Sequence, residues 1–202
     1  MVKVCILDYD SGNTKSVENI FERLNTDYCL SNLKKDIINS THLVLSGVGT
    51  YSTAMKKINN NLPLNIVIDE VLNKSKPILG ICVGMQIMSE VGFEFEKTQG
   101  LGWIKGKVKQ IESKSLPLPH IGWNEIIKNS KSNIVDKIKD GECFYFVNSF
   151  CFETIERYVV AYTNYGSKFP AIIQNKNIFG VQFHPEKSQK SGQKIIKNFL
   201  IM

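Results

Sequence analysis

The sequence predicts an α/β protein with a mostly parallel sheet flanked by helices and with added antiparallel strands in the second half. In the first half, almost continuous apolar runs alternate with segments of helical period, the pattern of strands buried on both faces. In the second half, short β-rich runs are separated by turn residues. The 202 residues contain no internal repeat and no linker rich in Pro, Gly and Ser, so one domain over residues 1–202 is expected.

The first half is expected to begin with a buried strand over Val2–Leu7. After a polar turn, apolar residues from Val17 to Leu24 recur at intervals of three and four, the period of an amphipathic helix beginning at Thr14. The next expected elements are a strand over His42–Ser46, a mainly helical stretch over Tyr51–Leu72 with a break near Pro63, a strand over Pro77–Ile81 and a helix over Val83–Ser89.

Six short runs in the second half are expected to be strands of the same sheet, some of them antiparallel. Their residues are largely β-branched or aromatic, which suits a pleated and half-buried surface. The runs are Ile104–Ile111, Trp123–Ile127, Cys143–Val147, Arg157–Tyr162, Ala171–Gln174 and Ile178–Phe183. An amphipathic helix over Lys194–Ile201 is expected to follow.

Composition excludes several classes of protein. No stretch of 18 apolar residues could form a transmembrane helix, and the N-terminal apolar stretch is too short for a secretory signal, so a cytoplasmic protein is expected. The five cysteines include no C-x-x-C pair, which favours reduced thiols. The three histidines lack zinc-site spacing, and no metal or other cofactor is expected. The net charge of +6 comes from scattered lysines, which favours a solvated surface over a nucleic-acid face.

The segment from Gly80 to Gly84 has the form G-x-C-x-G and lies between a predicted strand and a predicted helix. This is the context of a nucleophile elbow, in which flanking glycines leave room for a strained turn that exposes the central side chain. Peptide dipoles at the start of the helix would favour the thiolate of Cys82. The alternative is an unreactive cysteine buried in a strand–helix corner.

A cysteine nucleophile needs a base, and His184 is a candidate at the end of the predicted strand Ile178–Phe183. The carboxyl ends of parallel strands meet at one edge of a sheet, where Cys82 is also expected. Glu186 could turn back and hydrogen-bond the imidazole, completing a Cys-His-Glu relay. In isolation, His-Pro-Glu is also compatible with a solvated surface turn.

Attack by sulfur on a carbonyl creates an oxyanion that requires hydrogen-bond donors. The peptide N–H of Val83 is one candidate, and the glycine loop Gly47, Val48 and Gly49 can supply the second. A phosphate-binding loop is the competing interpretation, but neither G-x-G-x-x-G nor G-x-x-x-x-G-K-[ST] is present.

These residues resemble the class I glutamine amidotransferases, which carry G-x-C-x-G-M-Q and, near the C-terminus, F-H-P-E. Here the two motifs are Gly80–Gln86 and Phe183–Glu186. The resemblance extends from about residue 4 to residue 200 and implies the flavodoxin-like sheet of that family. Leu118–Asn124, Phe144–Val147 and Pro185–Ser188 point to those members that deliver ammonia to a (β/α)₈ barrel cyclase subunit in histidine biosynthesis.

The resemblance implies that L-glutamine is hydrolysed to glutamate and ammonia through a γ-glutamyl thioester on Cys82. The cyclase partner would use the ammonia to make imidazole glycerol phosphate and an aminoimidazole carboxamide ribonucleotide (AICAR). Glutaminase activity would be low without the partner, because the oxyanion donor must reorient. By the same resemblance, glutamine would contact Gln86, Glu94, Ser149 and Phe150, and the partner would contact Asn13, Pro119, Trp123, Asn124, Tyr145 and Lys187.

Three positions depart from the family pattern and leave alternatives open. Ser46 stands where proline usually precedes the oxyanion glycines, and Asn148 and Phe150 stand where the family usually has His and Tyr. A paralogous glutaminase that supplies ammonia for amidination of a surface-polysaccharide sugar is therefore one alternative. A stand-alone γ-glutamyl hydrolase is a second, and a binding module with an unreactive elbow is a third.

Overall fold

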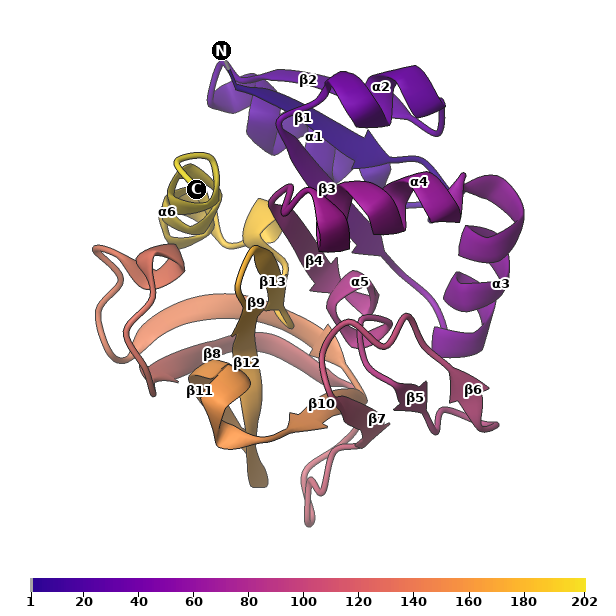
Figure 1. Cartoon of the computed structure of the whole chain (residues 1–202). Helices are drawn as coiled ribbons and strands as arrows, with labels where there is room; N and C mark the ends of the chain where they lie inside the picture. Colours follow the sequence, from indigo (N-terminus) through magenta and orange to yellow (C-terminus); the bar gives the residue numbers. More distant parts are fainter. Residues whose placement is uncertain (1) are drawn as a thin grey trace.

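The computed structural model describes residues 2–202, which form two sheets (Figure 1). The larger sheet has nine strands in the order β2-β1-β3-β4-β13-β12-β11-β8-β9, and the smaller has four in the order β10-β7-β5-β6. The strands are β1 (Lys3–Leu7), β2 (Asp27–Ser31), β3 (His42–Gly47), β4 (Ile78–Cys82), β5 (Val91–Gly92), β6 (Thr98–Gln99), β7 (Gly106–Gln110), β8 (His120–Lys128), β9 (Glu142–Asn148), β10 (Phe150–Thr154), β11 (Val159–Tyr165), β12 (Ser167–Asn175) and β13 (Ile178–Val181).

Five strands form the parallel part of the large sheet. The pairs β1–β2, β1–β3, β3–β4 and β4–β13 are all parallel. β3, β4 and β13 are buried at every position, as predicted for strands covered on both faces. The remaining strands, β12, β11, β8 and β9, add antiparallel pairs to this part. The predicted fold class is thereby confirmed.

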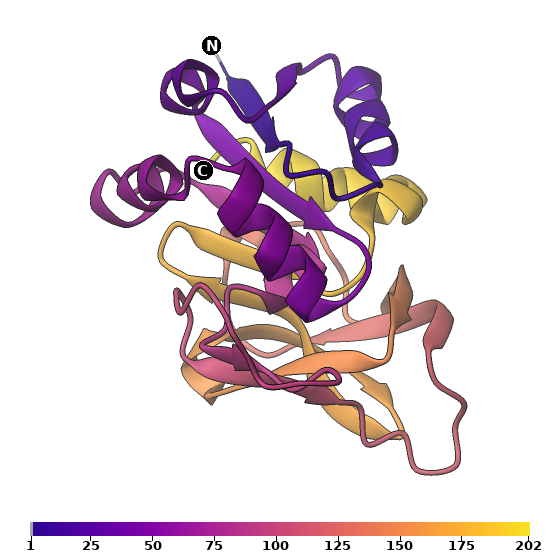
Figure 2. The same cartoon turned by 90° about the vertical axis from the view of Figure 1, so that its right-hand side faces the viewer.

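Helices cover both faces of the parallel strands. The helices are α1 (Thr14–Arg23), α2 (Lys34–Asn39), α3 (Tyr51–Asn61), α4 (Leu64–Ile68), α5 (Val83–Gln86) and α6 (Gln189–Phe199), and a π-helical turn over Asp69–Asn73 continues α4. Figures 1 and 2 show α1 and α6 on one face and α3 and α4 on the other. Across residues 2–202, no helix combines the length and apolar character needed to span a membrane.

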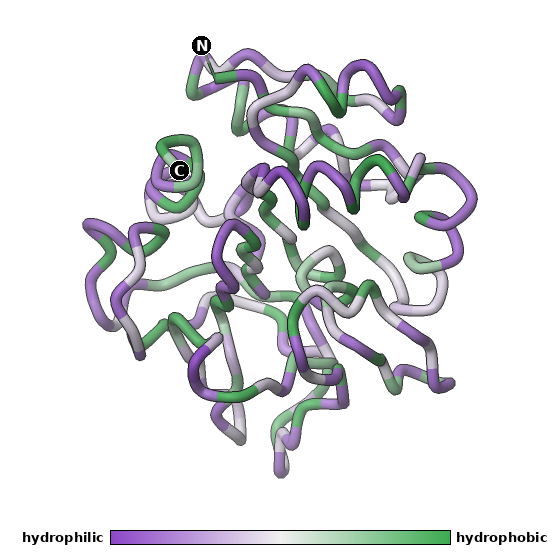
Figure 3. Tube along the Cα trace, viewed as in Figure 1, coloured by the Kyte–Doolittle hydropathy of each residue, from purple (hydrophilic) through white to green (hydrophobic). Residues whose placement is uncertain are grey.

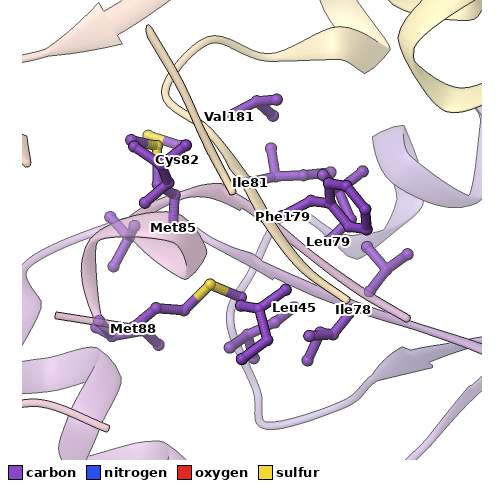
Figure 4. Close-up of a cluster of buried hydrophobic side chains, with 14 of the residues drawn as sticks. Leu45, Ile78, Leu79, Ile81, Cys82, Met85, Met88, Phe179 and Val181 are labelled. Atoms are coloured by element: carbon purple, nitrogen blue, oxygen red, sulfur yellow. The ribbon is translucent and has the colours of Figure 1, made fainter. Parts of the chain in front are cut away.

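The core lies between these layers. Hydrophobic residues follow the central strands, and hydrophilic ones alternate with them on the outer helices (Figure 3). Close to the parallel strands, Leu45, Leu79 and Phe179 pack in a buried cluster with Met85, the cluster that Figure 4 enlarges. This packing fixes β3, β4 and β13 against one another, and the ends of these three strands carry the predicted site residues.

One prediction about the sheets is wrong. The run Ile104–Ile111 was expected to join the main sheet, but its strand, β7, pairs with β10 in the small sheet. The reason lies at Ser149, the single residue between β9 and β10, where the chain passes from the large sheet to the small one. The Ser149 carbonyl accepts a hydrogen bond from the Ile111 N–H at 2.9 Å, which holds this crossing beside β7.

Several element boundaries also differ from those expected. β2 and α2 were not anticipated, because β2 is a partly exposed edge strand and α2 buries only Ile37. The elbow helix ends at Gln86 instead of Ser89. α6 begins at Gln189, five residues before the expected Lys194, because Gly192 lets the first turn pack on the chain at Pro185. A Cβ atom at Gly192 would lie 1.8 Å from the Pro185 carbonyl oxygen.

Candidate active site

Cys82 is the last residue of β4, and α5 begins at the next residue. Its backbone has φ 54° and ψ −113°, a region that costs energy for any residue with a Cβ atom. The flanking glycines are required by close backbone contacts, since a Cβ atom on Gly84 would lie 1.7 Å from the Leu45 carbonyl oxygen and one on Gly80 2.7 Å from the Gly84 carbonyl oxygen. The sequence therefore forms the strained strand–helix turn that the motif predicts.

The Cys82 side chain is buried, with 5% of the residue exposed. Figure 4 places it at one end of the apolar cluster, next to Met85. Two polar groups approach the sulfur within 3.8 Å: the Val147 carbonyl oxygen and the amide nitrogen of Gln182. Sequence analysis did not single out Gln182, although it follows directly after β13, the parallel neighbour of β4.

His184 and Glu186 lie at the same edge of the sheet as Cys82. Val181, the last residue of β13, pairs with Ile81, so the chain that continues to His184 leaves the sheet beside the elbow. The His184 Nδ1 atom lies 2.8 Å from Glu186 Oε1, and the two side chains are 4% and 0% exposed. Asn13 donates a second hydrogen bond to the same carboxylate oxygen at 3.3 Å.

This environment favours the charged form of His184. Burial alone would lower its pKa, but hydrogen bonds to Cys82 and Glu186, together with the negative charge of both groups, outweigh burial and raise the pKa of His184 to about 10. The imidazole is therefore protonated at neutral pH. A protonated imidazole between a sulfur and a carboxylate is suited to stabilise a thiolate and to donate a proton to a leaving group.

The predicted oxyanion loop lies beside the elbow. Gly47 ends β3 and pairs in parallel register with Cys82. Gly49 has φ +97°, a conformation that favours glycine, and Val48 between them is 42% exposed. Val83 opens α5, and peptide N–H groups in the first turn of a helix have no partner within the helix. Both predicted sources of donors thus lie at the carboxyl ends of adjacent strands.

Of the residues predicted to contact glutamine, Gln86 and Phe150 lie together next to Cys82. The Gln86 amide nitrogen donates to the Phe150 carbonyl oxygen at 2.9 Å and to Gln182 Oε1 at 3.0 Å. The Glu94 carboxylate accepts a hydrogen bond from the Tyr51 N–H at 2.7 Å at the start of α3, two residues after Gly49 of the predicted oxyanion loop. Burial raises the pKa of Glu94. Ser149 is the residue at which the chain changes sheets.

The residues predicted to contact a partner are divided between two environments. Trp123 and Tyr145 are register partners on β8 and β9, with ring centroids 6.0 Å apart, and the Lys187 ammonium lies 5.9 Å from the Tyr145 ring centre. Trp123 is 49% exposed. Pro119 is also exposed. The Asn124 amide is instead turned toward the Asn164 carbonyl oxygen, and Asn13 toward Glu186.

Two of the three positions that depart from the family pattern, Ser46 and Asn148, hold buried polar atoms near the site. The hydroxyl of Ser46, on β3, makes no hydrogen bond to any residue within 2–202. Asn148 donates to the Phe150 carbonyl oxygen at 3.0 Å, while its own amide oxygen has no partner in the described chain. Both departures therefore lie in the strands that carry the candidate site and leave the Cys82, His184 and Glu186 arrangement intact.

Comparisons with known proteins agree with this geometry. The sequence profile of the family "Glutamine amidotransferase class-I" matches residues 5–202. "Imidazole glycerol phosphate synthase subunit HisH 2" of Vibrio vulnificus (strain YJ016) is 40% identical over 201 residues, which cover 98% of this chain and 94% of that protein. The HisH subunit of Pelagibacter ubique (strain HTCC1062) is 42% identical over 207 residues, which cover 98% of this chain and 99% of that one.

A solved structure has the same fold. The structure of PurLQS from Thermotoga maritima matches with a TM-score of 0.73 at 18% sequence identity, covering 99% of this chain and 98% of that chain. At this identity the match concerns the arrangement of helices and strands alone.

Proposed function

The chain belongs to the class I glutamine amidotransferase family, and from this we propose that it is a glutaminase subunit that releases ammonia for imidazole glycerol phosphate synthesis in histidine biosynthesis. The observation that carries the proposal is the buried pair of His184 and Glu186 beside Cys82 at the carboxyl ends of adjacent parallel strands. The names of the HisH relatives, which match over nearly their whole length, supply the pathway.

The reaction begins with the Cys82 thiolate attacking the side-chain amide carbon of L-glutamine. The carbon–sulfur bond forms as the carbonyl π electrons move to oxygen, and His184 then donates its proton to the departing nitrogen. Breaking the carbon–nitrogen bond releases ammonia and leaves a γ-glutamyl thioester on Cys82. Because His184 is protonated before attack, the proton needed by the leaving group is already in place.

Water completes the cycle. His184, now neutral, removes a proton from a water molecule that attacks the thioester, and the sulfur leaves as thiolate while glutamate is released. Glu186 holds the imidazole in the required orientation through Nδ1, which leaves Nε2 to face the sulfur and the substrate. The protein thereby returns to its starting protonation state.

The oxyanion of both steps would be held by Val83 N–H and by a peptide N–H of the Gly47–Gly49 loop. Each such donor is worth about 3 kcal/mol of transition-state stabilisation in enzymes of this kind. Gly49 has the backbone freedom to turn its peptide, because nothing lies within 4 Å of where its Cβ atom would be. If this loop reorients on partner binding, the free subunit is expected to have low glutaminase activity.

Glutamine would be held by Gln86, Glu94, Ser149 and Phe150. The Gln86 amide nitrogen is already engaged, so its amide oxygen would accept a hydrogen bond from the substrate α-ammonium group. Glu94 would add a negative charge for the same group.

Ammonia would pass to a (β/α)₈ barrel cyclase subunit. Its docking surface would include Trp123, Tyr145 and Lys187, which lie together. The family resemblance adds Pro119, Asn13 and Asn124 to this surface. An exposed tryptophan next to a tyrosine and a lysine is typical of an interface anchor. The Tyr145 carbonyl accepts a hydrogen bond from the His184 N–H at 2.8 Å, so this surface adjoins the catalytic histidine through one residue.

The test is to purify the protein with its co-expressed partner and supply glutamine labelled with ¹⁵N in the amide. Label is expected in the imidazole ring of imidazole glycerol phosphate. Cys82→Ala should abolish glutamine-dependent synthesis and leave synthesis from free ammonia intact, because only the nucleophile is lost. Label in an amidino sugar would refute the pathway, and loss of both activities in Cys82→Ala would refute the role of Cys82.

A further inference from the structure

We propose that Gln182 is a further catalytic residue, whose side-chain amide donates a hydrogen bond to the Cys82 sulfur and keeps it in the thiolate form. The inference rests on the proposed glutaminase function, because it concerns the same nucleophile. It adds a donor that neither the elbow nor the Cys-His-Glu relay contains.

The fold places Gln182 opposite Cys82. The parallel register pairs Ile81 with Val181, so the residues that follow, Cys82 and Gln182, stand next to each other where both strands end. Gln182 is fully buried, and its peptide N–H is held by the Ala171 carbonyl oxygen at 2.9 Å. Its amide nitrogen lies 3.8 Å from the Cys82 sulfur, within hydrogen-bond range for sulfur.

The surrounding hydrogen bonds determine which end of the Gln182 amide faces the sulfur. The Phe150 carbonyl oxygen can only accept, so the Gln86 atom that contacts it must be the amide nitrogen. The same nitrogen also contacts Gln182 and must meet an acceptor there, which is Oε1. The Gln182 nitrogen is therefore directed at Cys82, because the direction of every hydrogen bond in this chain is fixed by the Phe150 carbonyl oxygen, which can only accept.

The Gln182 N–H and the neighbouring Val147 carbonyl oxygen have opposite effects on the protonation of the Cys82 sulfur. The Val147 carbonyl oxygen, also 3.8 Å from the sulfur, can only accept and so favours the protonated thiol. An N–H donor favours the thiolate, because hydrogen bonds to a charged acceptor are stronger than those to a neutral one. Because Gln182 is shielded from water, its side-chain N–H has no competing solvent partner. If this donor is removed, the contacts from Val147 and His184 alone determine whether the Cys82 sulfur is protonated.

The test is the pH dependence of Cys82 alkylation by iodoacetamide, followed by mass spectrometry of the Cys82 peptide. Gln182→Met keeps the side-chain length and removes the donor. It is expected to raise the pH midpoint of labelling by about one unit and so to slow labelling about tenfold at pH values below that midpoint, the effect of losing one hydrogen bond to a charged group. Gln182→Asn, which withdraws the amide from the sulfur, should shift the midpoint in the same direction.

Gln174→Met is the matched control, because Gln174 lies on β12 at the opposite end of the sheet, in register with Phe179. Its labelling profile should equal that of the wild type. The exposed Cys143 serves as an internal reference thiol. If Gln182→Met does not fold, Gln182→Asn decides the question.

Two negative results have different meanings. Selective labelling of wild-type Cys82 with an unchanged midpoint in the folded Gln182 variants would overturn the role of Gln182 and leave the glutaminase proposal standing. A pH midpoint for wild-type Cys82 no lower than that of Cys143 would overturn both, because the thiolate at the elbow would not be stabilised.

Discussion

At the scale of single residues, the charge on His184 depends on its two neighbours. The pKa of His184 is raised to about 10 although burial opposes it, because Cys82 and Glu186 hydrogen-bond the charged imidazole. An ordinary histidine titrates at about 6.5. The stabilisation of the folded state by this charge is therefore complete below about pH 6.5 and is lost as the pH rises toward 10.

Glu186→Gln should lower the pKa of His184, since it removes one negative partner and keeps the shape of the side chain. NMR titration of the His184 ring would measure the shift, with Glu125→Gln on exposed β8 surface as the control. Glutamine hydrolysis should fall roughly 100-fold or more, within the usual contribution of a correctly held acid–base group. An unchanged His184 titration in Glu186→Gln would show that the carboxylate does not act on the imidazole.

Residue patterns revealed part of the site and missed the rest for a physical reason. Cys82 is recognisable because a glycine stands two residues before it and two residues after it, and a Cβ atom at Gly84 would strike the Leu45 carbonyl. His184 and Glu186 are separated only by Pro185, so the sequence alone indicates that their side chains can meet. Gln182 carries no local signal, because its importance comes from the β4–β13 register and from Gln86, 96 positions earlier in the chain.

At the scale of elements, the elbow between β4 and α5 depends on contact with β3. Gly84→Ala should lower the free energy of unfolding by about 3 kcal/mol, because an added methyl group would overlap a backbone oxygen that cannot move aside. Gly102→Ala is the comparison: it has φ +68° and open space around the Cβ position, so only a backbone cost of about 1 to 2 kcal/mol is expected. Urea denaturation of both variants measures the difference, and equal losses would contradict a steric role for Gly84.

The sequence predicts that a run is a strand more reliably than it predicts which sheet that strand joins, above all where the pairing partner is distant in sequence. β11 and β12 are joined by a single turn residue, Gly166, and both runs were expected as strands. β7 was expected as a strand too, but its partner β10 begins 40 residues after β7 ends, beyond the crossing at Ser149. Hydrophobic patterning reports which residues are buried and carries little information about which strand lies alongside.

At the scale of the whole molecule, the proposed docking surface and His184 are joined through β9. Tyr145 contributes its side chain to the surface with Trp123 and Lys187, and its backbone carbonyl to the His184 N–H. The Tyr145 N–H donates to the Ser188 hydroxyl at 2.9 Å, and that hydroxyl donates to the His184 carbonyl at 2.7 Å. A partner that moves β9 would therefore act directly on the turn that carries the imidazole.

Trp123→Ala should weaken partner binding by at least 2 kcal/mol, about 30-fold in Kd, as expected for a central aromatic anchor. Ile127→Ala, at another exposed apolar position of β8, is the control and should have a much smaller effect. Isothermal titration with the purified cyclase subunit gives both values. Equal affinities of Trp123→Ala and the wild type would place the partner on a different surface.

Acylation of Cys82 by glutamine, with His184 beside the sulfur, underlies every step of the proposed reaction. The most direct measurement is mass spectrometry of the Cys82 peptide after acid quenching of the complex during glutamine turnover. We expect a γ-glutamyl adduct on that peptide in the wild type, and neither adduct nor hydrolysis in Cys82→Ala. Continued glutamine hydrolysis by Cys82→Ala, or turnover with an adduct on another residue, would contradict this mechanism.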